Sequence, residues 1–488
     1  MKIKDLILKN ECTLLSGSEE TEINEIVMDS RIAKNGDMFI AIKGEYTDGH
    51  NYIDQVLERG VTVIAITNPQ FKINLKNITF ILVKSGTLAL AKLADDFYGQ
   101  PSCKLIGITG TNGKTTTSYV VRNLLEKSGI KTGLISTIAY EYDQRSIPAE
   151  RTTPDIFTLY SLLHKMSARD VKIVVMEVSS HAVHQKRIGY LKYDVAIFTN
   201  LTPDHLDYHK TMDNYYEAKK VFFSSLKMDG VAIINISDYW GKKLASELNE
   251  KYRVCTFGIN EQTANYNINK YETNINGSVF TLVDDKNISY KVESPLLGKH
   301  NIENCLAALV ACGKFNIELA ILIDHCKLLN NVPGRLEFVK NKDMPLIVVD
   351  YAHTENAIKS VLECLRGITI GKLWIVFGCG GDRDKTKRPK MGAVAEQIAD
   401  KVVVTTDNPR TEIPSEIIND ILSGMHTNKY ITIEDRRAAI KYACESADAS
   451  DIILIAGKGH EKYQEINRIV YEFDEIKIIY NILENIKK

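Results

Sequence analysis

The sequence predicts an α/β fold of several domains, from its apolar runs and its length. Short runs rich in β-branched residues alternate with longer stretches of helical periodicity, an order typical of βαβ units. Many of the short runs are almost continuously apolar, which indicates strands buried on both faces of a parallel sheet. These runs are residues 61–67, 104–109, 172–177, 195–200, 346–350, 373–378, 401–406 and 451–456. A chain of 488 residues is too long for one ordinary core, so two to four domains are expected.

The positions of these runs divide the chain into three blocks. Residues 1–98 form a small α/β block, and residues 99–330 open with a strand and a glycine-rich turn. A further α/β block, residues 331–488, begins near a Pro-Gly-Arg sequence. Between residues 251 and 299 the chain is richer in Asn, Thr and Tyr and alternates in polarity, which indicates antiparallel strands attached to the central block.

Composition argues against nucleic-acid binding, membrane insertion and a disulfide framework. The 61 basic and 62 acidic residues give a formal net charge of −1, so no global basic field attracts nucleic acid. No apolar run approaches the roughly 20 residues that span a bilayer, and the N-terminal segment lacks the apolar core of a signal peptide. Nine scattered cysteines without a Cys-x-x-Cys pair favour reduced thiols. We therefore expect a cytoplasmic protein that binds neither nucleic acid nor membrane.

The run 104–109 leads into a glycine-rich turn and then into a helix that ends at about residue 127. Glycines let the backbone curl so that its amides point at phosphates, and the helix N-terminus adds positive potential. Lys114 can then reach the β and γ phosphates, and the Thr115 hydroxyl can bind Mg²⁺. The longer phosphate-loop pattern needs glycine where Ile108 stands, so only Gly-x-x-Gly-Lys-Thr is present. The alternative is a chance turn, which the flanking strand and helix disfavour.

Acidic, histidine and lysine residues follow the next two apolar runs. Glu177 ends its run, where an acid beyond a phosphate-loop strand can hold Mg²⁺. His205 lies in an Asp-His-Leu-Asp-Tyr-His sequence, and Lys219 lies on an expected helix. The alternatives are a solvated histidine-rich loop and an ordinary surface lysine, and spacing alone favours the surface lysine.

In order and spacing, five motifs together resemble those of the Mur ligases, and the resemblance covers essentially the whole chain. The motifs are GTNGKTT at 110–116, EVSSH at 177–181, TNLTPDHLD at 199–207, GKHNIEN at 298–304 and DYAHT at 350–354. The resemblance implies a three-domain architecture. Residues 1–98 would bind the UDP substrate, residues 99–330 would form a central P-loop ATPase domain, and residues 331–488 would form a Rossmann-like domain that binds an amino acid.

The resemblance also implies a reaction, because it is closest to the members that add the third amino acid of the cell-wall peptide. Such a ligase uses ATP and Mg²⁺ to join meso-diaminopimelate to the D-glutamate of UDP-N-acetylmuramoyl-L-alanyl-D-glutamate through an acyl phosphate. The product is a precursor of peptidoglycan, so a part in cell shape and cell division is implied. We expect a monomeric enzyme.

Catalytic, metal and nucleotide contacts are carried over onto the matching motifs. The catalytic set is Lys114, Glu177, His205 and Lys219. The metal set is Thr115, Glu177, His205 and a carbamylated Lys219, in which the carbamate turns a cation into a carboxylate-like ligand. Lys220 is the neighbouring candidate, but the residues before Lys219 fit the family pattern better. The ATP set is Gly110, Thr111, Asn112, Gly113, Lys114, Thr115, Thr116, Asn304, Arg335, Asp350 and His353.

The resemblance assigns two further sets, one for each of the other substrates. The UDP-muramoyl-peptide set is Ser30, Thr152, Thr153, Ser179, Gln185 and Arg187. The diaminopimelate set is Arg383, Asp407, Asn408, Pro409, Arg410, Gly457 and Glu461. Arginine chemistry is consistent with this assignment, because a guanidinium can bind a carboxylate bidentately and diaminopimelate has an extra carboxylate for Arg410 to bind. The alternative is a strand-terminal turn broken by Pro409, with an exposed arginine.

Several rival functions remain open. L-Lysine or lanthionine could be the third residue, lanthionine because it presents nearly the same carboxylates and amines. A folylpolyglutamate-type ligase would share the ATPase and C-terminal modules, but the block 1–98 with its Asp-Ser-Arg sequence argues against it. A P-loop motor or switch would hydrolyse ATP without a carboxylate acceptor. Lys114, Glu177 and His205 together count against a non-catalytic scaffold.

Overall fold

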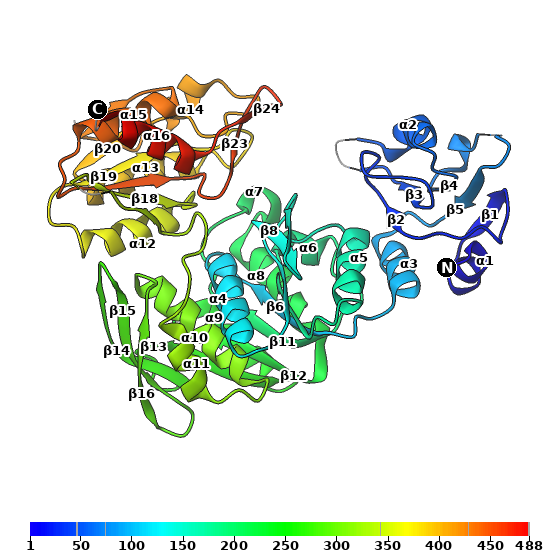
Figure 1. Cartoon of the computed structure of the whole chain (residues 1–488), viewed down its shortest axis with the longest axis horizontal. Coiled ribbons are helices and arrows are strands. Elements are labelled where there is room, and N and C mark those ends of the chain that lie inside the picture. The colour runs from blue at the N-terminus through cyan, green and yellow to red at the C-terminus, as the bar shows by residue number, and fades with distance from the viewer. Residues whose placement is uncertain (45–46, 74, 342, 428, 487–488) are drawn as a thin grey trace. The chain divides into compact units, whose positions relative to one another are not determined.

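The structure is a computed structural model of the whole chain, and it describes residues 1–44, 47–73, 75–341, 343–427 and 429–486 (Figure 1). Contacts divide the chain into two compact units. Unit 1 comprises Met1–Gly107, Ile130–Ala196 and Ala218–Gly230, and unit 2 comprises Ile108–Gly129, Ile197–Glu217 and Val231–Lys488. The phosphate loop and the whole C-terminal block therefore belong to unit 2.

The N-terminal block is a five-stranded sheet in the order β1-β5-β4-β3-β2, drawn in blue in Figure 1. Its elements are α1 Ile3–Lys9, β1 Thr13–Ser16, β2 Ile26–Val27, β3 Met38–Ala41, α2 Ile53–Glu58, β4 Val63–Ile66, β5 Thr79–Leu82 and α3 Thr87–Tyr98. Strand β1 is antiparallel to β5, and the other pairs are parallel. Phe39, Ile64 and Phe80, on three neighbouring strands, are fully buried in one cluster. This packing explains the apolar run 61–67.

The central sheet has eleven strands in the order β16-β15-β14-β13-β12-β11-β6-β10-β7-β8-β9. The strands are β6 Lys104–Thr109, β7 Thr132–Ile135, β8 Ala139–Tyr142, β9 Arg145–Pro148, β10 Ile173–Glu177, β11 Tyr193–Phe198, β12 Leu226–Asn235, β13 Arg253–Ile259, β14 Tyr266–Asn274, β15 Gly277–Val283 and β16 Ser289–Ser294. The runs predicted at 104–109, 172–177 and 195–200 are strands β6, β10 and β11.

The antiparallel strands expected between residues 251 and 299 are present, with one difference. Strands β14, β15 and β16 are antiparallel, as predicted. Strand β13 instead pairs in parallel with both β12 and β14. The helix α9 (Tyr239–Leu248) connects β12 to β13. A helical crossover brings the chain back to the edge of the sheet at which β12 began, so β13 runs in the same direction as β12.

Besides α9, the central block has helices between and after its strands, and four of these helices begin within the sequence motifs. The helices other than α9 are α4 Lys114–Lys127, α5 Ile156–Ser167, α6 Ser180–His184, α7 Leu206–His209, α8 Met212–Lys220, α10 Lys299–Gly313 and α11 Leu319–Cys326. Helix α4 ends where the sequence predicts, and it packs against α10 within unit 2. The small residues Ala307, Ala308 and Ala311 are buried on α10, and they permit this close approach.

The C-terminal block is a six-stranded sheet in the order β17-β18-β22-β19-β20-β21, with helices on both faces. Its strands are β17 Glu337–Val339, β18 Leu346–Asp350, β19 Leu373–Phe377, β20 Lys401–Val404, β21 Tyr430–Thr432 and β22 Ile452–Ala456. Its helices are α12 Glu355–Arg366, α13 Lys387–Ile398, α14 Pro414–Leu422, α15 Arg436–Ser446 and α16 Glu475–Ile486. On β19, Ile375 belongs to the core of one face, and Trp374 and Val376 belong to the core of the other. Burial on both faces accounts for the continuous apolar runs in this block.

Four parallel strands of this sheet bring their carboxyl ends to one edge. Strands β18, β22, β19 and β20 are neighbours, and all of these pairs are parallel. Asp350 is the last residue of β18. Gly457 follows β22 directly, and Asp407 lies three residues after the end of β20. The hairpin β23–β24 (Tyr463–Ile466 and Ile469–Glu472) follows β22. Ligands of open α/β sheets bind at this edge.

Membrane-spanning helices were sought among the described residues. None of the helices in that part of the chain is both long enough and apolar enough to cross a bilayer.

Candidate functional site

The phosphate loop has the backbone that its glycines predict. Gly110 (φ 149°) and Gly113 (φ 84°) lie in a region that side chains disfavour. A Cβ atom at Gly110 would overlap Thr199 Oγ1, and one at Gly113 would overlap Asn304 Oδ1. Only glycine therefore fits at either end of the turn, directly before the first turn of α4.

Hydrogen bonds to the segment after β11 hold the loop in place within unit 2. Thr111 N donates to Asn200 O and Asn112 N donates to Asn200 Oδ1, each at 2.9 Å. Thr199 Oγ1 donates to Asn112 O at 2.6 Å. Lys114 Nζ bends back over the loop and donates to the carbonyls of Gly110 and Thr111 at 2.9 and 2.8 Å. The ammonium thus lies over the turn in which phosphates are expected.

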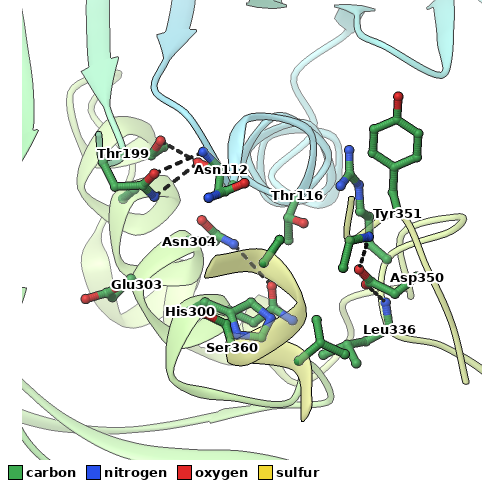
Figure 2. Close-up of a pocket in the computed structure, with 18 of the residues that line it drawn as sticks. Asn112, Thr116, Thr199, His300, Glu303, Asn304, Leu336, Asp350, Tyr351 and Ser360 are labelled. Atoms are coloured by element: carbon green, nitrogen blue, oxygen red, sulfur yellow. Dashed lines mark hydrogen bonds between the residues drawn. The ribbon is translucent and has the colours of Figure 1, made fainter. Parts of the chain in front are cut away.

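A pocket opens beside this loop, and Figure 2 shows it lined by α10 and by the start of the C-terminal block. Its polar wall includes Asn112, Thr116, His300, Glu303, Asn304, Arg335, Asp350 and His353. Phe257, Ala307 and Leu336 supply apolar surface. Six side chains of the predicted ATP set are thus brought together, those of Asn112, Thr116, Asn304, Arg335, Asp350 and His353. A pocket with apolar walls and a few polar groups suits a nucleotide base and sugar.

Two histidines of the pocket are neutral near pH 7. Burial lowers the pKa of His300 to about 4, and burial, helped by the charge of Lys387, lowers the pKa of His353 to about 4. His353 Nδ1 lies 2.8 Å from Tyr351 O. Because a carbonyl can only accept, Nδ1 carries the proton and Nε2 is the acceptor.

Asp350 and Arg335 organise the strand end beside the pocket. Asp350 accepts from Leu336 N at 2.7 Å and from Ala352 N at 2.8 Å, one bond to each oxygen. Arg335 Nη2 donates to Thr115 Oγ1 at 3.2 Å, and its guanidinium lies over the Tyr351 ring. Arg335 Nε is buried and has no hydrogen-bond partner among the described residues. A buried donor left without a protein partner suits an anionic ligand.

Five of the six residues predicted to bind the UDP-muramoyl peptide lie in one hydrogen-bonded cluster in unit 1. Thr153 Oγ1 donates to Glu177 O at 2.9 Å and accepts from Ser179 N at 3.1 Å. Arg187 Nη1 donates to Thr153 O at 3.2 Å, and its Nη2 donates to Gln185 Oε1. Five residues, Thr153, Glu177, Ser179, Gln185 and Arg187, therefore meet near the carboxyl end of β10. Ser30 is not bonded to this cluster; its hydroxyl is buried and donates to Gln55 Oε1 at 3.0 Å.

Glu177 is fully buried in the same cluster, and Thr137 orients it. Thr137 N donates to one carboxylate oxygen at 2.9 Å, and Thr137 Oγ1 donates to the other at 3.0 Å. Thr137 Oγ1 also contacts Thr152 Oγ1 at 3.1 Å. Thr137 was not predicted from the sequence. The only sequence feature that could have pointed to it is weak: it is a threonine shortly after the short strand β7.

The residues expected to hold a metal are divided between the units. Thr115 and His205 belong to unit 2, and Glu177 and Lys219 belong to unit 1. Lys219 is only 1% exposed, so the alternative of an ordinary surface lysine is wrong. The His205 ring is exposed on a residue with φ 54°, and its Nε2 lies 3.5 Å from Asp204 Oδ2. The predicted metal roles stay predictions.

The predicted amino-acid set gathers at the edge of the C-terminal sheet. Asn408 Nδ2 donates to Glu461 Oε2 at 3.0 Å. Asp407 and Asn408 are buried, and a Cβ atom at Gly457 would overlap Asp407 Oδ2. Arg383 is exposed, but its loop contacts Arg410, because Arg410 Nη1 donates to Gly381 O at 2.7 Å. Arg410 is half-buried and paired with Glu465, so the alternative of a turn with an exposed arginine is wrong.

Buried charges lie beneath this set, and sequence reasoning missed them. Lys458 is fully buried, and its Nζ donates to Asn408 Oδ1 at 2.7 Å and to Tyr463 O at 2.8 Å. Arg436 Nε donates to Glu475 Oε1 at 2.6 Å, and Arg436 Nη2 donates to Ala456 O at 2.8 Å. Burial lowers the pKa of Lys458. Lys458 stands inside the Gly-Lys-Gly-His-Glu sequence, which could have pointed to it, whereas nothing local marks Arg436.

Family profiles match three consecutive parts of the chain. A profile described as "Mur ligase family, catalytic domain" matches residues 22–98, one described as "Mur ligase middle domain" matches 108–312, and one described as "Mur ligase, glutamate ligase domain" matches 334–459. A protein of Clostridium tetani named UDP-N-acetylmuramoyl-L-alanyl-D-glutamate–2,6-diaminopimelate ligase is 40% identical, over 100% of both chains. The chain belongs to the Mur ligase family. A ligase of the same name from Phocaeicola vulgatus is 42% identical over 99% of this chain and 100% of its own.

Solved structures agree with membership of the Mur ligase family. A ligase with the same substrates in its name is 31% identical and covers 100% of this chain and 99% of its own, with a TM-score of 0.65. MurF of Thermotoga maritima in complex with ADP is 21% identical and shares the fold, with a TM-score of 0.70 over 95% of this chain and 97% of its own. The predicted α/β class and three-domain Mur ligase architecture are confirmed, as is the ligase class. The boundaries at residues 98 and 330 stay predictions.

We expect acid to destabilise the folded Mur ligase chain partly through His353. Its pKa is about 4 when folded against 6.5 in the unfolded reference, so between these values the unfolded chain binds more protons. The free energy of unfolding therefore falls as the pH falls through this range. His353→Gln should lose less stability than the wild type between about pH 7 and pH 5, measured by urea midpoints at each pH. The control is His164→Gln, at an exposed histidine. If the urea midpoints of the two variants change equally with pH, the expectation is contradicted.

Proposed function

We propose that this chain is an ATP-dependent Mur ligase that joins meso-diaminopimelate to the D-glutamate of UDP-N-acetylmuramoyl-L-alanyl-D-glutamate. The names of relatives that match over their whole length support this activity. One structural observation carries it. Tyr351 lines the nucleotide pocket and donates its hydroxyl to Glu461 Oε1 at 3.3 Å. The pocket and the amino-acid set therefore share a wall within unit 2, as expected where an ATP-activated carboxylate meets an amine.

ATP is proposed to lay its phosphates on the loop 110–116 and its base in the pocket. Lys114 Nζ would exchange two loop carbonyls for the β and γ phosphates. Arg335 Nε, which has no hydrogen-bond partner in the described part of the chain, lies beside Thr115, where a phosphate oxygen would accept. Phe257 and Leu336 would contact the purine, and the neutral His300 beside them brings no charge toward it.

The proposed reaction has two steps. A D-glutamyl carboxylate oxygen attacks the γ phosphorus, the bond from that phosphorus to ADP breaks, and an acyl phosphate forms. The amine of diaminopimelate then attacks the acyl carbon and gives a tetrahedral intermediate, from which inorganic phosphate leaves as the amine loses its proton. Lys114 and Arg335 stabilise the negative charge on the phosphoryl group, and positioning of the reactants carries most of the rate enhancement.

The residues proposed to hold Mg²⁺ are Thr115, Glu177, His205 and a carbamylated Lys219. Their chemistry fits the ion, because three of the four would supply oxygen, the ligand that Mg²⁺ prefers. The burial of Lys219 and the two Thr137 bonds that orient Glu177 support the assignment. When bound, Mg²⁺ would neutralise phosphate charge.

The other substrate contacts extend the proposal. Thr152, Thr153, Ser179, Gln185 and Arg187 would contact the muramoyl peptide, since they already form one cluster around Glu177. Ser30 would contact the uridine nucleotide. We also propose a monomeric, cytoplasmic enzyme in peptidoglycan precursor synthesis that binds neither nucleic acid nor membrane.

Two rivals are weakened by particular observations. A folylpolyglutamate synthase of Mycobacterium tuberculosis shares the fold over only 76% of this chain, whereas the named diaminopimelate ligases match along its full length. A P-loop motor would need no ordered amino-acid set, yet Asn408 and Glu461 are bonded to one another at the sheet edge. Lysine and lanthionine, the rival third residues, are distinguished from diaminopimelate by the mass of the conjugate.

The decisive experiment offers each amino acid singly to the enzyme with ATP, Mg²⁺ and UDP-N-acetylmuramoyl-L-alanyl-D-glutamate. We expect a product whose mass has risen by one diaminopimelate residue, with one ADP and one phosphate released for each bond. Lysine should give far less product. ATP hydrolysis without any conjugate would contradict the ligase proposal, and equal use of lanthionine would widen the substrate class to amino diacids.

Lys219→Ala should abolish turnover if the carbamate is a metal ligand. We expect a loss of roughly 10³-fold or more, as for removal of a group that stabilises charge in the transition state. Short carboxylic acids should restore part of the activity by occupying the vacated space. Lys220→Ala is the matched control and should stay active. Loss of activity in the Lys220 variant alone would move the assignment to the neighbouring residue.

Arg410→Ala should raise the KM for diaminopimelate sharply and change the KM for ATP much less. Loss of a charged partner in a closed site costs on the order of 2–5 kcal/mol, or roughly 30- to 5,000-fold. Lysine lacks the distal carboxylate, so the preference for diaminopimelate over lysine should narrow. Steady-state kinetics with both amino acids measure this, with Arg468→Ala, in the exposed hairpin turn, as the charge-matched control. An unchanged preference would show that Arg410 does not read the substrate carboxylate.

A further inference from the structure

The hairpin β23–β24 contacts the amino-acid motif through several residues, among them Gln464, whose Nε2 donates to Asp407 O at 2.8 Å. Glu465 makes three of these hydrogen bonds. Glu465 N donates to Asn408 Oδ1 at 3.0 Å, and Glu465 O accepts from Arg410 N at 3.1 Å. The Glu465 side chain adds a third bond, because its Oε2 accepts from Arg410 Nε at 3.1 Å. No sequence motif marks Glu465, since its contacts join a hairpin to a loop 55 positions earlier.

Arg410 has an uncommon backbone conformation that the hairpin stabilises. Its φ of 51° lies in the left-handed region, which is costly for a residue with a side chain. The hairpin satisfies both polar groups of this residue, because Arg410 N donates to Glu465 O and Asn467 N donates to Arg410 O at 2.6 Å. These backbone bonds fix where the arginine side chain starts, and they do not depend on the Glu465 side chain.

The guanidinium of Arg410 is held on two sides and open on the third. Its Nε donates to Glu465 Oε2, and its Nη1 donates to Gly381 O at 2.7 Å. Nη2 has no hydrogen-bond partner within the described part of the chain. Because a guanidinium is planar and rigid, two fixed donors fix the plane and the direction of the remaining N–H groups. The side chains of Arg410 and Glu465 are 19% and 27% exposed, so the pair is partly accessible from solvent.

We propose that Glu465 is a positioning residue that determines specificity for an amino diacid, acting through Arg410. It holds the guanidinium so that Nη2 faces the distal carboxylate of the incoming amino acid. The inference rests on the proposed function, in which Arg410 reads that carboxylate. A held guanidinium loses less conformational entropy when the substrate binds, so the gain appears as affinity for the diacid. An amino acid without a second carboxylate gains nothing from this arrangement.

A competing role for Glu465 predicts the opposite sign. A carboxylate beside Arg410 could act as a decoy that occupies the cation until the substrate displaces it. Removing a decoy would lower the KM for diaminopimelate, whereas removing a positioning group raises it. Among the residues that the structure describes, Nη2 has no partner while Nε is bonded to Glu465. A substrate carboxylate can therefore bind without displacing Glu465, which favours positioning.

The test compares Glu465→Ala, Glu465→Gln and the control Glu472→Ala in the full-length enzyme. Glu472 lies on the partner strand of the same hairpin and is exposed. For Glu465→Ala we expect the KM for diaminopimelate to rise about 10-fold, as for loss of a hydrogen bond to a charged group. Its kcat with diaminopimelate should stay within about 2-fold of the wild-type value, and so should its kcat/KM for lysine. Glu465→Gln should recover most of the loss, because its amide oxygen can still accept from Nε. Glu472→Ala should behave as the wild type.

The outcomes separate the inference from the function on which it rests. A wild type that prefers diaminopimelate, with an unchanged or lower KM in Glu465→Ala, overturns the positioning role and leaves the proposed function intact. An equal loss for diaminopimelate and lysine identifies a merely structural role and also overturns it. A wild type that uses lysine as well as diaminopimelate overturns both. Thermal midpoints check folding, and if Glu465→Ala does not fold, Glu465→Asp, which withdraws the carboxylate by one methylene group, gives the same comparison.

Discussion

Parallel strands of one sheet end at the same edge, and the functional geometry of this chain depends on that constraint. In the C-terminal sheet, β18, β20 and β22 deliver Asp350, Asp407 and Gly457 to one edge, although these residues are far apart in the sequence. In the central block, β6 ends at the phosphate loop and β10 ends at Glu177. The strand interiors are apolar on both faces, so polar chemistry can occur only where the strands end.

Buried carboxylates at these ends carry a second constraint, because an unpartnered charge in the interior is costly. Glu177 accepts two bonds from Thr137, and Asp350 accepts one backbone N–H on each oxygen. Asp407 is less fully satisfied: its Oδ1 accepts from Asn408 N, whereas its Oδ2 lacks a hydrogen bond within the described residues. Lys458 and Arg436 lie about 4.0 Å from the two Asp407 oxygens and offset the charge. The hydrogen bonds that satisfy these buried carboxylates thus also fix the orientation of Glu177, Asp350 and Asp407.

Much of the fold and several parts of the site could be predicted from the sequence. Each predicted apolar run coincides with or overlaps a strand, because continuous burial on both faces leaves a local record in composition. The turn at 110–116 could be recognised because its glycines are needed for backbone reasons that act within a few residues. The family resemblance supplied the substrate set in unit 1, whose members the structure joins by hydrogen bonds.

What the sequence by itself determined is therefore local: the strands, the helix starts, the glycine-dependent turn and the residue types that phosphate and carboxylate chemistry require. Only the tertiary structure decided that Lys219 is buried, that Thr137 holds Glu177 and that Glu465 holds Arg410. The physical reason is that these contacts join segments tens of residues apart, through side chains whose partners depend on strand order and hairpin placement. Spacing along the chain carries no record of such pairs, whereas periodic burial and backbone strain are imprinted on neighbouring residues.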